Sequence, residues 1–142
     1  MAVRFLDDVI DYNMPNHALE KIKEAVSSDR RVGLGLTGLA DALLLMKLRY
    51  DSEEALAVVE KIMQTICHRA YETSIALAQE KGAFPRFDWK GLSRSRFIQS
   101  LPKALQESVR KHGLRNSTLV TMPPVGTGSI VARTSSGIEP IF

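Results

Sequence analysis

Apolar positions recur every three or four residues through most of this chain, and that spacing predicts a mainly α-helical fold. The pattern is strongest at 52–81, where it continues over about seven turns. Asp51 is placed to cap this long helix, Glu54 completes a capping box, and Gly82 supplies a left-handed stop. The positions that step along one face are Leu56, Val59, Met63, Ile66, Ala70, Thr73 and Leu77.

Shorter stretches with the same spacing predict further helices. They lie at about 3–10, 19–29, 93–100 and 102–112. A fifth stretch, at 37–48, is apolar nearly all round, so we expect it to be the most buried element.

The composition of the chain changes after residue 113. Leu119–Met122 is short, apolar and partly β-branched, which predicts a buried strand that Pro123 and Pro124 end. The residues that follow are small, polar and glycine-rich. A length of 142 residues suits one domain, here a helical scaffold at 1–113 followed by one or two short strands and a turn at 114–142.

Basic residues gather in one part of the chain. Residues 84–115 hold eight Lys and Arg side chains against Asp88 and Glu107, whereas the whole chain has a net charge of +3. Such a stripe suits an anionic partner, for example phosphate, a nucleotide, nucleic acid or an acidic protein surface. It is also typical of a solvated helix face, and both interpretations stay open.

Other features of the sequence narrow the functional classes. No uninterrupted apolar run approaches the ~20 residues that span a bilayer, so no membrane association is expected. Three acids within the first eleven residues are unlike a secretory signal, which favours a cytoplasmic protein. The single cysteine, Cys67, excludes an internal disulfide and a cysteine-based zinc site. The three histidines lack ligand spacing, so we expect no metal site.

Gly33–Gly38 reads GLGLTG and matches the G-x-G-x-x-G pattern of dinucleotide-binding folds. In those folds the glycines follow a strand, and an acidic residue lies about 20 residues further on at the end of the next strand. Here the preceding residues do not predict a strand, and Asp51 begins a helix instead. The glycines are therefore interpreted as allowing close packing at a helix N-terminus.

The better candidate for phosphate binding is a second glycine-rich turn. Its residues are Val125, Gly126, Thr127, Gly128 and Ser129. Free backbone N–H groups at such a turn attract an anion, and the Thr127 and Ser129 hydroxyls add donors. The turn is not a Walker A loop because no lysine precedes Ser129. From local features alone, it is also compatible with an ordinary turn.

Four segments together resemble a known family, the large catalytic subunit of ribonucleotide reductase. They read FLDDVIDYNMP, RRVGLGLTGLADALLLMKLRYDSEEAL, SIALAQEKGAFPRF and RNSTLVTMPPVGTGSIVARTSSGIEPIF. They follow the family's order at about its spacing, and the resemblance covers nearly the whole chain, more weakly at 88–113. It is closest to the adenosylcobalamin-dependent class.

The resemblance implies a fold and a role. The chain would be a mostly helical segment of a ten-stranded α/β barrel that reduces the 2′-carbon of ribonucleotides by radical chemistry. In the family the turn that matches Val125, Gly126, Thr127, Gly128 and Ser129 binds the substrate phosphates. Gly137–Pro140 would help to shape the wall of that site. Whether the substrate is a di- or a triphosphate stays open.

The same resemblance shows what this sequence lacks. The family's thiyl-forming cysteine, its reducing cysteine pair and its Asn-x-Cys-x-Glu motif are all missing, so no catalytic residue is assigned here. The chain is expected to be a piece of a reductase, inactive alone, that binds the remaining barrel or self-associates. Adenosylcobalamin is implied for the family but not as a ligand of this segment. The alternative is a basic helical module for nucleic-acid binding or scaffolding. Nucleic acid is the less favoured of the expected partners.

Overall fold

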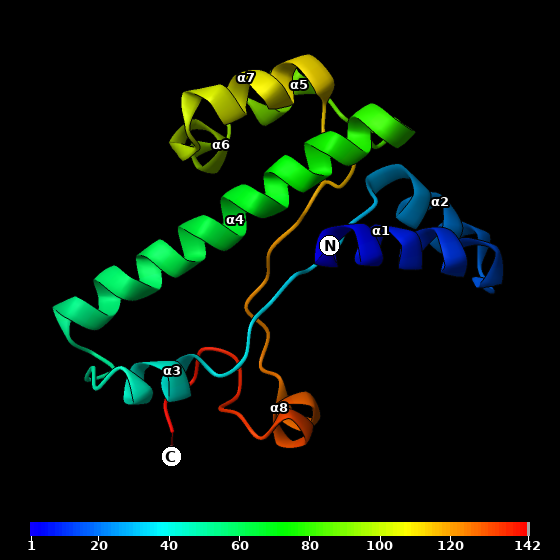
Figure 1. Cartoon of the computed structure of the whole chain (residues 1–142). Helices are drawn as coiled ribbons and strands as arrows, with labels where there is room; N and C mark the ends of the chain where they lie inside the picture. Colours follow the sequence, from blue (N-terminus) through cyan, green and yellow to red (C-terminus); the bar gives the residue numbers. More distant parts are fainter. Residues whose placement is uncertain (142) are drawn as a thin grey trace. The chain divides into compact units, whose positions relative to one another are not determined.

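The computed structural model describes residues 1–141, and its regular structure is helical (Figure 1). The elements are α1 (Ala2–Asn13), the 3₁₀ helix η1 (Met14–Asn16), α2 (Glu20–Asp29), α3 (Leu39–Leu45), α4 (Glu53–Lys81), α5 (Trp89–Leu92), α6 (Arg96–Ser100), α7 (Lys103–His112) and α8 (Gly126–Ala132). The expected mainly α fold is confirmed. None of the helices described is both long and apolar enough to cross a membrane.

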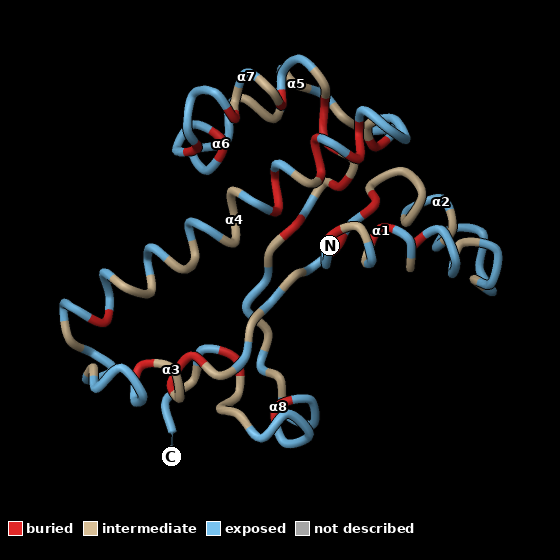
Figure 2. The backbone as a smooth tube through the Cα atoms, in the orientation of Figure 1, coloured by how far each residue is buried: buried red, intermediate tan, exposed pale blue. Residues whose placement is uncertain are grey.

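The residues group into two compact units. The first unit comprises Met1–Gly33 and Cys67–Leu119, and the second comprises Leu34–Ile66 and the described residues from Val120 onward. In the first unit, buried residues gather on the C-terminal half of α4 and on the helices that follow it (Figure 2). The largest apolar side chains there that are fully buried are Leu77, Leu114 and Val109. In the second unit, Leu39, Leu43 and Ala55 form the core, with Leu36, Leu48 and Val59 packed against it.

The long helix predicted at 52–81 is α4, and only its N-terminal cap differs from the prediction. The Ala55 N–H donates to the Ser52 hydroxyl at 3.2 Å, so Ser52 rather than Asp51 is the capping residue. The Asp51 carboxylate instead pairs with Arg49, at 2.6 Å. Gly82 adopts the expected left-handed conformation with φ +87° and ends the helix.

The helix predicted at 37–48 is α3, and the expectation that it is the most buried element is wrong. Leu39 and Leu43, one turn apart, face the core, whereas Leu44 is 65% exposed and Leu45 is 83% exposed. An apolar helix is buried all round only where neighbours cover every face. In the described part of the second unit, the core covers one face.

The strand predicted at Leu119–Met122 is not formed among residues 1–141. Instead, Val120 makes one isolated parallel bridge with Leu34, and the Thr121 N–H donates to the Leu34 carbonyl at 3.0 Å. Pro123 follows and has no N–H to extend the pairing. A Cβ on Gly35 would lie 3.0 Å from the Pro123 ring and 3.2 Å from the Thr121 carbonyl oxygen, so glycine suits the place where the two segments meet.

The region at 93–112 also differs in detail from the sequence prediction. The weak helix expected at 93–100 is α6, which begins only at Arg96, and α5, at Trp89–Leu92, lies before the predicted range. The Asp88 carboxylate caps α5 by accepting from the N–H groups of Lys90 and Gly91. The helix expected at 102–112 is α7, which Gly113 ends at φ +77°.

Candidate functional site

The predicted phosphate-binding residues lie at the start of α8, in the second unit. Val125 is the N-cap residue, and Gly126, Thr127, Gly128 and Ser129 form the first turn of the helix. Gly126, Thr127 and Gly128 are exposed, whereas Ser129 is buried. The glycine-rich segment is therefore a helix N-terminus, and its first N–H groups have no acceptor within the helix.

Hydrogen bonding divides this turn into free and engaged groups. Among residues 1–141, no acceptor lies within hydrogen-bond reach of the N–H groups of Gly126, Thr127 and Gly128. The Ser129 N–H donates to the Val125 carbonyl at 3.2 Å, and its hydroxyl donates to the Gly126 carbonyl at 2.8 Å. Three adjacent amides are thus available to a ligand, while Ser129 supports the turn from within.

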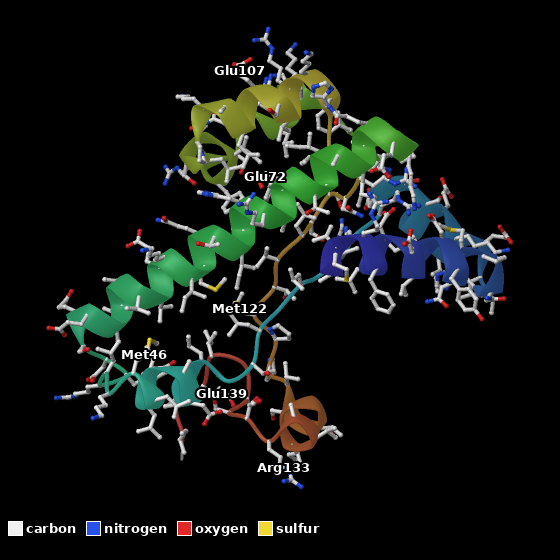
Figure 3. All side chains as sticks on the ribbon, in the orientation of Figure 1. Met46, Glu72, Glu107, Met122, Arg133 and Glu139 are labelled. Atoms are coloured by element: carbon white, nitrogen blue, oxygen red, sulfur yellow. The ribbon has the colours of Figure 1, made fainter. Side chains whose placement is uncertain are left out.

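The segment that follows α8 returns to hold the turn in place. Arg133 ends the helix in the left-handed conformation at φ +55°. The Thr134 N–H then donates to the Ser129 carbonyl at 3.0 Å, and the Val125 N–H donates to the Ser136 hydroxyl at 3.1 Å. Figure 3 labels Arg133 at the end of α8, where its side chain points away from the helix.

The GLGLTG segment meets this returning segment at the start of α3. The Gly38 N–H donates to the Ser135 carbonyl at 2.9 Å, and the Ser135 N–H donates to the Asp41 carboxylate at 2.6 Å. The Thr134 hydroxyl donates to that of Thr37 at 3.2 Å. Gly38 has φ +78° as the N-cap of α3. These contacts agree with the interpretation of the glycines as packing residues at a helix N-terminus.

Gly137 packs the segment that follows α8 against Pro123. Its φ is +50°, and a Cβ there would lie 2.8 Å from the Pro123 carbonyl oxygen. The Glu139 N–H donates to the Ser136 carbonyl at 2.9 Å, and the Tyr50 hydroxyl donates to the Ile138 carbonyl. The GIEP residues therefore shape the chain beside the turn.

The first unit contains a buried polar network that the sequence analysis did not predict. It consists of Asp7, Arg30, Ser74, Arg115 and Asn116, and is called the Asp7 network below. Asp7 is fully buried, and Arg30 is 5% exposed. The Asp7 carboxylate accepts from Arg30 Nη2 at 2.8 Å, from Asn116 Nδ2 at 2.9 Å and from Arg115 Nε at 3.2 Å.

Backbone and hydroxyl groups complete the Asp7 network. The Ser74 hydroxyl donates to Asn116 Oδ1 at 3.1 Å and accepts from the Asn116 N–H at 3.1 Å. Arg115 also donates to the carbonyl oxygens of Lys81 and Gly82, which end α4. Burial raises the pKa of Asp7, but the hydrogen bonds from Arg30, Asn116 and Arg115 outweigh it and leave the pKa below the ordinary carboxyl value.

Asp7, Asp8 and Asp11 bring their carboxylates close enough together to be considered as metal ligands. Cations of the chain already occupy this cluster, since Lys81 Nζ lies 2.6 Å from Asp8 and Arg30 Nη2 lies 2.7 Å from Asp11. The cluster is therefore a set of ion pairs. Asp7 and Asp11 lie one turn apart in a helical pattern, and that spacing was the available signal in the sequence.

The remaining candidates show no functional grouping. Cys67 is half-buried, and burial raises the pKa of its thiol, which disfavours the reactive thiolate. Burial also raises the pKa of Tyr71 to about 12. Within the described residues, no metal-binding group includes a histidine. In the basic stripe, Arg115 turns into the Asp7 network, so that part of the stripe is not a surface feature.

The comparisons with known proteins cover the whole chain. Residues 1–142 match the family described as "Ribonucleotide reductase, barrel domain". A "Vitamin B12-dependent ribonucleoside-diphosphate reductase" of Mycobacterium tuberculosis (strain ATCC 25618 / H37Rv) is 39% identical over 142 residues, which are 100% of this chain and 18% of that protein.

Two further relatives agree. The protein of the same name from Thermoplasma acidophilum is 42% identical over 141 residues, or 99% of this chain and 16% of its own length. A "Ribonucleoside-diphosphate reductase subunit alpha" of Treponema pallidum is 34% identical over 148 positions, with 100% of this chain and 17% of that protein covered. The chain thus spans less than one fifth of these relatives, and it belongs to the ribonucleotide reductase family, within the barrel domain of the large subunit.

Proposed function

We propose that this chain is part of the catalytic α/β barrel of an adenosylcobalamin-dependent ribonucleotide reductase, and that Val125–Ser129 binds the phosphates of the ribonucleotide substrate. The observation that carries the proposal is the set of three adjacent N–H groups at Gly126, Thr127 and Gly128, which are exposed and without acceptors among the described residues. The family match supplies a substrate whose phosphates suit them.

Backbone amides suit this task for physical reasons. The first N–H groups of a helix point along its axis, and the helix dipole adds a partial positive charge at the same end. A Cβ at position 128 would lie 2.8 Å from the Val125 side chain, so glycine suits this position in the turn, whereas a Cβ at 126 would meet nothing within 4 Å. The Thr127 hydroxyl lies on the exposed turn and adds one side-chain donor. In this division of roles, Ser129 holds the turn while its neighbours contact the ligand.

The radical chemistry is assigned to parts of the reductase outside this chain. Cys67 is the only cysteine, it is half-buried, and the reaction of the family needs three thiols. We infer that the partner of this segment is the remaining portion of the barrel. Exposed apolar side chains on α3 and α8 of the second unit, including Leu45 and Val131, provide surfaces of the required kind.

The residues described here do not fit a binding site for adenosylcobalamin. The one histidine on α4, His68, belongs to no group of converging ligands in the part of the chain described, and nor do His17 and His112. We therefore assign the cofactor to another part of the reductase. When bound there, it would supply the radical that starts the reduction.

The sharpest test removes one amide proton and leaves the helix intact. Gly126 is the first residue of α8, a position where proline is well accepted. In the full chain, Gly126→Pro is expected to weaken pyrophosphate binding by about 1.5–3 kcal/mol, roughly ten- to a hundredfold, because a hydrogen bond to a charged group is lost. Isothermal titration calorimetry at constant ionic strength measures this.

Gly126→Ala is the matched control, since it adds a side chain in open space and keeps the N–H. It is expected to bind pyrophosphate like the original chain. Equal affinity in the proline and alanine variants would show that the amide at 126 does not contact phosphate.

A further inference from the structure

The Val125–Ser129 turn is only weakly held by its own helix. α8 has seven residues, and Pro123 and Pro124, which precede Val125, have no backbone N–H to anchor the chain on that side. Short isolated helices are marginal in water, so the orientation of the free amides depends on contacts from outside α8.

Ser136 provides one of these contacts at the N-cap itself. Its hydroxyl accepts from the Val125 N–H at 3.1 Å, across eleven residues of sequence. Val125 is the residue immediately before the three free amides. A shift of this N-cap residue therefore changes the direction in which all three N–H groups point.

Asp41 provides the second contact, which it makes with Ser135, the residue before Ser136. Its carboxylate accepts from the Ser135 N–H at 2.6 Å, and its own N–H donates to the Ser135 hydroxyl at 3.4 Å. Asp41 lies in the first turn of α3, between Leu39 and Leu43 of the core of the second unit. The charged hydrogen bond thus ties the segment that holds the turn to a packed helix.

We propose that Asp41 and Ser136 are positioning residues for the phosphate-binding turn, a role that rests on the proposed function. Asp41 fixes Ser135 on α3, Ser136 then fixes Val125, and the three amides of Gly126–Gly128 are held ready for one phosphate group. Productive sites require such groups to be held within about 0.5 Å, which a seven-residue helix needs outside support to achieve.

The test uses the full chain, with pyrophosphate as the probe and nuclear magnetic resonance of the amides at 126–128 as the readout. Asp41→Ala and Ser136→Ala are each expected to weaken pyrophosphate binding about three- to tenfold, because each removes one supporting hydrogen bond. Both are also expected to shift the three amide resonances before any ligand is added. Ser136→Thr and Asp41→Asn, which keep an oxygen acceptor, are expected to recover most of the affinity.

Asp51→Ala is the matched control, because Asp51 is an exposed aspartate of the same unit whose partner is Arg49. It is expected to leave both affinity and resonances unchanged. Thermal unfolding of every variant shows whether it is folded, and Ser136→Ala with its threonine partner decides the test if Asp41→Ala does not fold.

The outcomes separate this inference from the proposed function. If the original chain binds pyrophosphate and the two alanine variants bind it equally well, the positioning role is overturned while the phosphate site stands. If the original chain shows no change at 126–128 with pyrophosphate, the phosphate site is rejected, and the positioning role is rejected with it. Weakened binding that Ser136→Thr restores supports the inference.

Discussion

Asp7 in the first unit and the Gly126–Gly128 amides in the second are polar groups with opposite surroundings. The Asp7 carboxylate is fully buried and accepts hydrogen bonds from three different side chains. The three amides are exposed and have no acceptor among the described residues. Polar groups whose partners lie in the chain stabilise the fold, whereas polar groups left free at a fixed position can bind a ligand.

This difference also explains why a cluster of acids is not evidence of a metal site here. Asp7, Asp8 and Asp11 gather more formal charge than any part of the α8 turn, yet Arg30, Lys81 and Arg115 neutralise them. The α8 turn has no charged side chain, but its backbone donors are unsatisfied. The number of hydrogen-bonding groups without a partner is therefore a better guide to ligand binding than the number of charged side chains.

The largest effect is expected from removing the centre of the Asp7 network. Asp7→Ala should lower the free energy of unfolding by about 3–5 kcal/mol, because Arg30 is left buried without its main partner. Urea denaturation measures the loss. Asp8→Ala is the control on the same helix: Asp8 is exposed and pairs with Lys81, so its loss should stay within about 1 kcal/mol. Similar losses in the two variants would contradict a special role for the buried carboxylate.

A smaller effect is expected from the backbone that supports the α8 turn. Gly137→Ala should lower the free energy of unfolding by about 1–3 kcal/mol. The backbone there has φ +50°, and the added Cβ would lie 2.8 Å from the Pro123 carbonyl oxygen. Gly126→Ala is the counterpart in open space and should change stability by less than about 0.5 kcal/mol. Thermal unfolding of both variants measures the difference, and an unchanged melting temperature for Gly137→Ala would show that this backbone adapts.

Acid should gradually lower the stability of the folded first unit. The pKa of Asp7 is below its ordinary value of 3.8, so the unfolded chain takes up a proton before the folded one does. The contribution of Asp7 is therefore complete above pH 3.8 and is lost as the pH falls through the lower folded value. Urea denaturation at a series of pH values measures this. Asp7→Asn should reduce the slope in that range, and an unchanged slope would assign the acid sensitivity to other carboxylates.

The smallest effect is expected from a ligand of the second unit. Pyrophosphate at a concentration equal to its dissociation constant should stabilise the chain by only about 0.4 kcal/mol. Thermal unfolding at matched ionic strength should show this small rise, and Gly126→Pro should abolish it while Asp8→Ala retains it. A rise of the same size in Gly126→Pro would indicate a general salt effect.

Local patterns in the sequence were sufficient for most of the helices. The spacing at 52–81 predicted α4 almost to the residue, because helical hydrogen bonds join residues four apart. The predicted cap, Asp51, is one residue too early, because Asp51 and Ser52 are both good N-cap residues and only geometry distinguishes them. Burial of α3 was overestimated because hydrophobicity does not show which faces have neighbours.

The Asp7 network could not be read from the sequence because its partners are distant along the chain. Arg30 is 23 residues from Asp7, Arg115 is 108 residues away and Asn116 is 109 residues away. The Val125–Ser129 turn was accessible to prediction because it is local and glycine-rich. The engagement of the Ser129 hydroxyl by Gly126 was not, since composition does not reveal which donors a turn uses itself.

The backbone conformation and the side-chain contacts at position 30 favour different amino acids. Its backbone has φ +46°, where glycine is the least strained residue, while its side chain supplies the guanidinium that Asp7 requires. A glycine at this position would relax the main chain but remove one of the two guanidinium groups that hydrogen-bond to the buried Asp7 carboxylate. A lysine would keep the charge but lose the fork of donors. Directed evolution for thermal robustness should therefore find few acceptable replacements at position 30, and local conformational preference would be a poor guide to them.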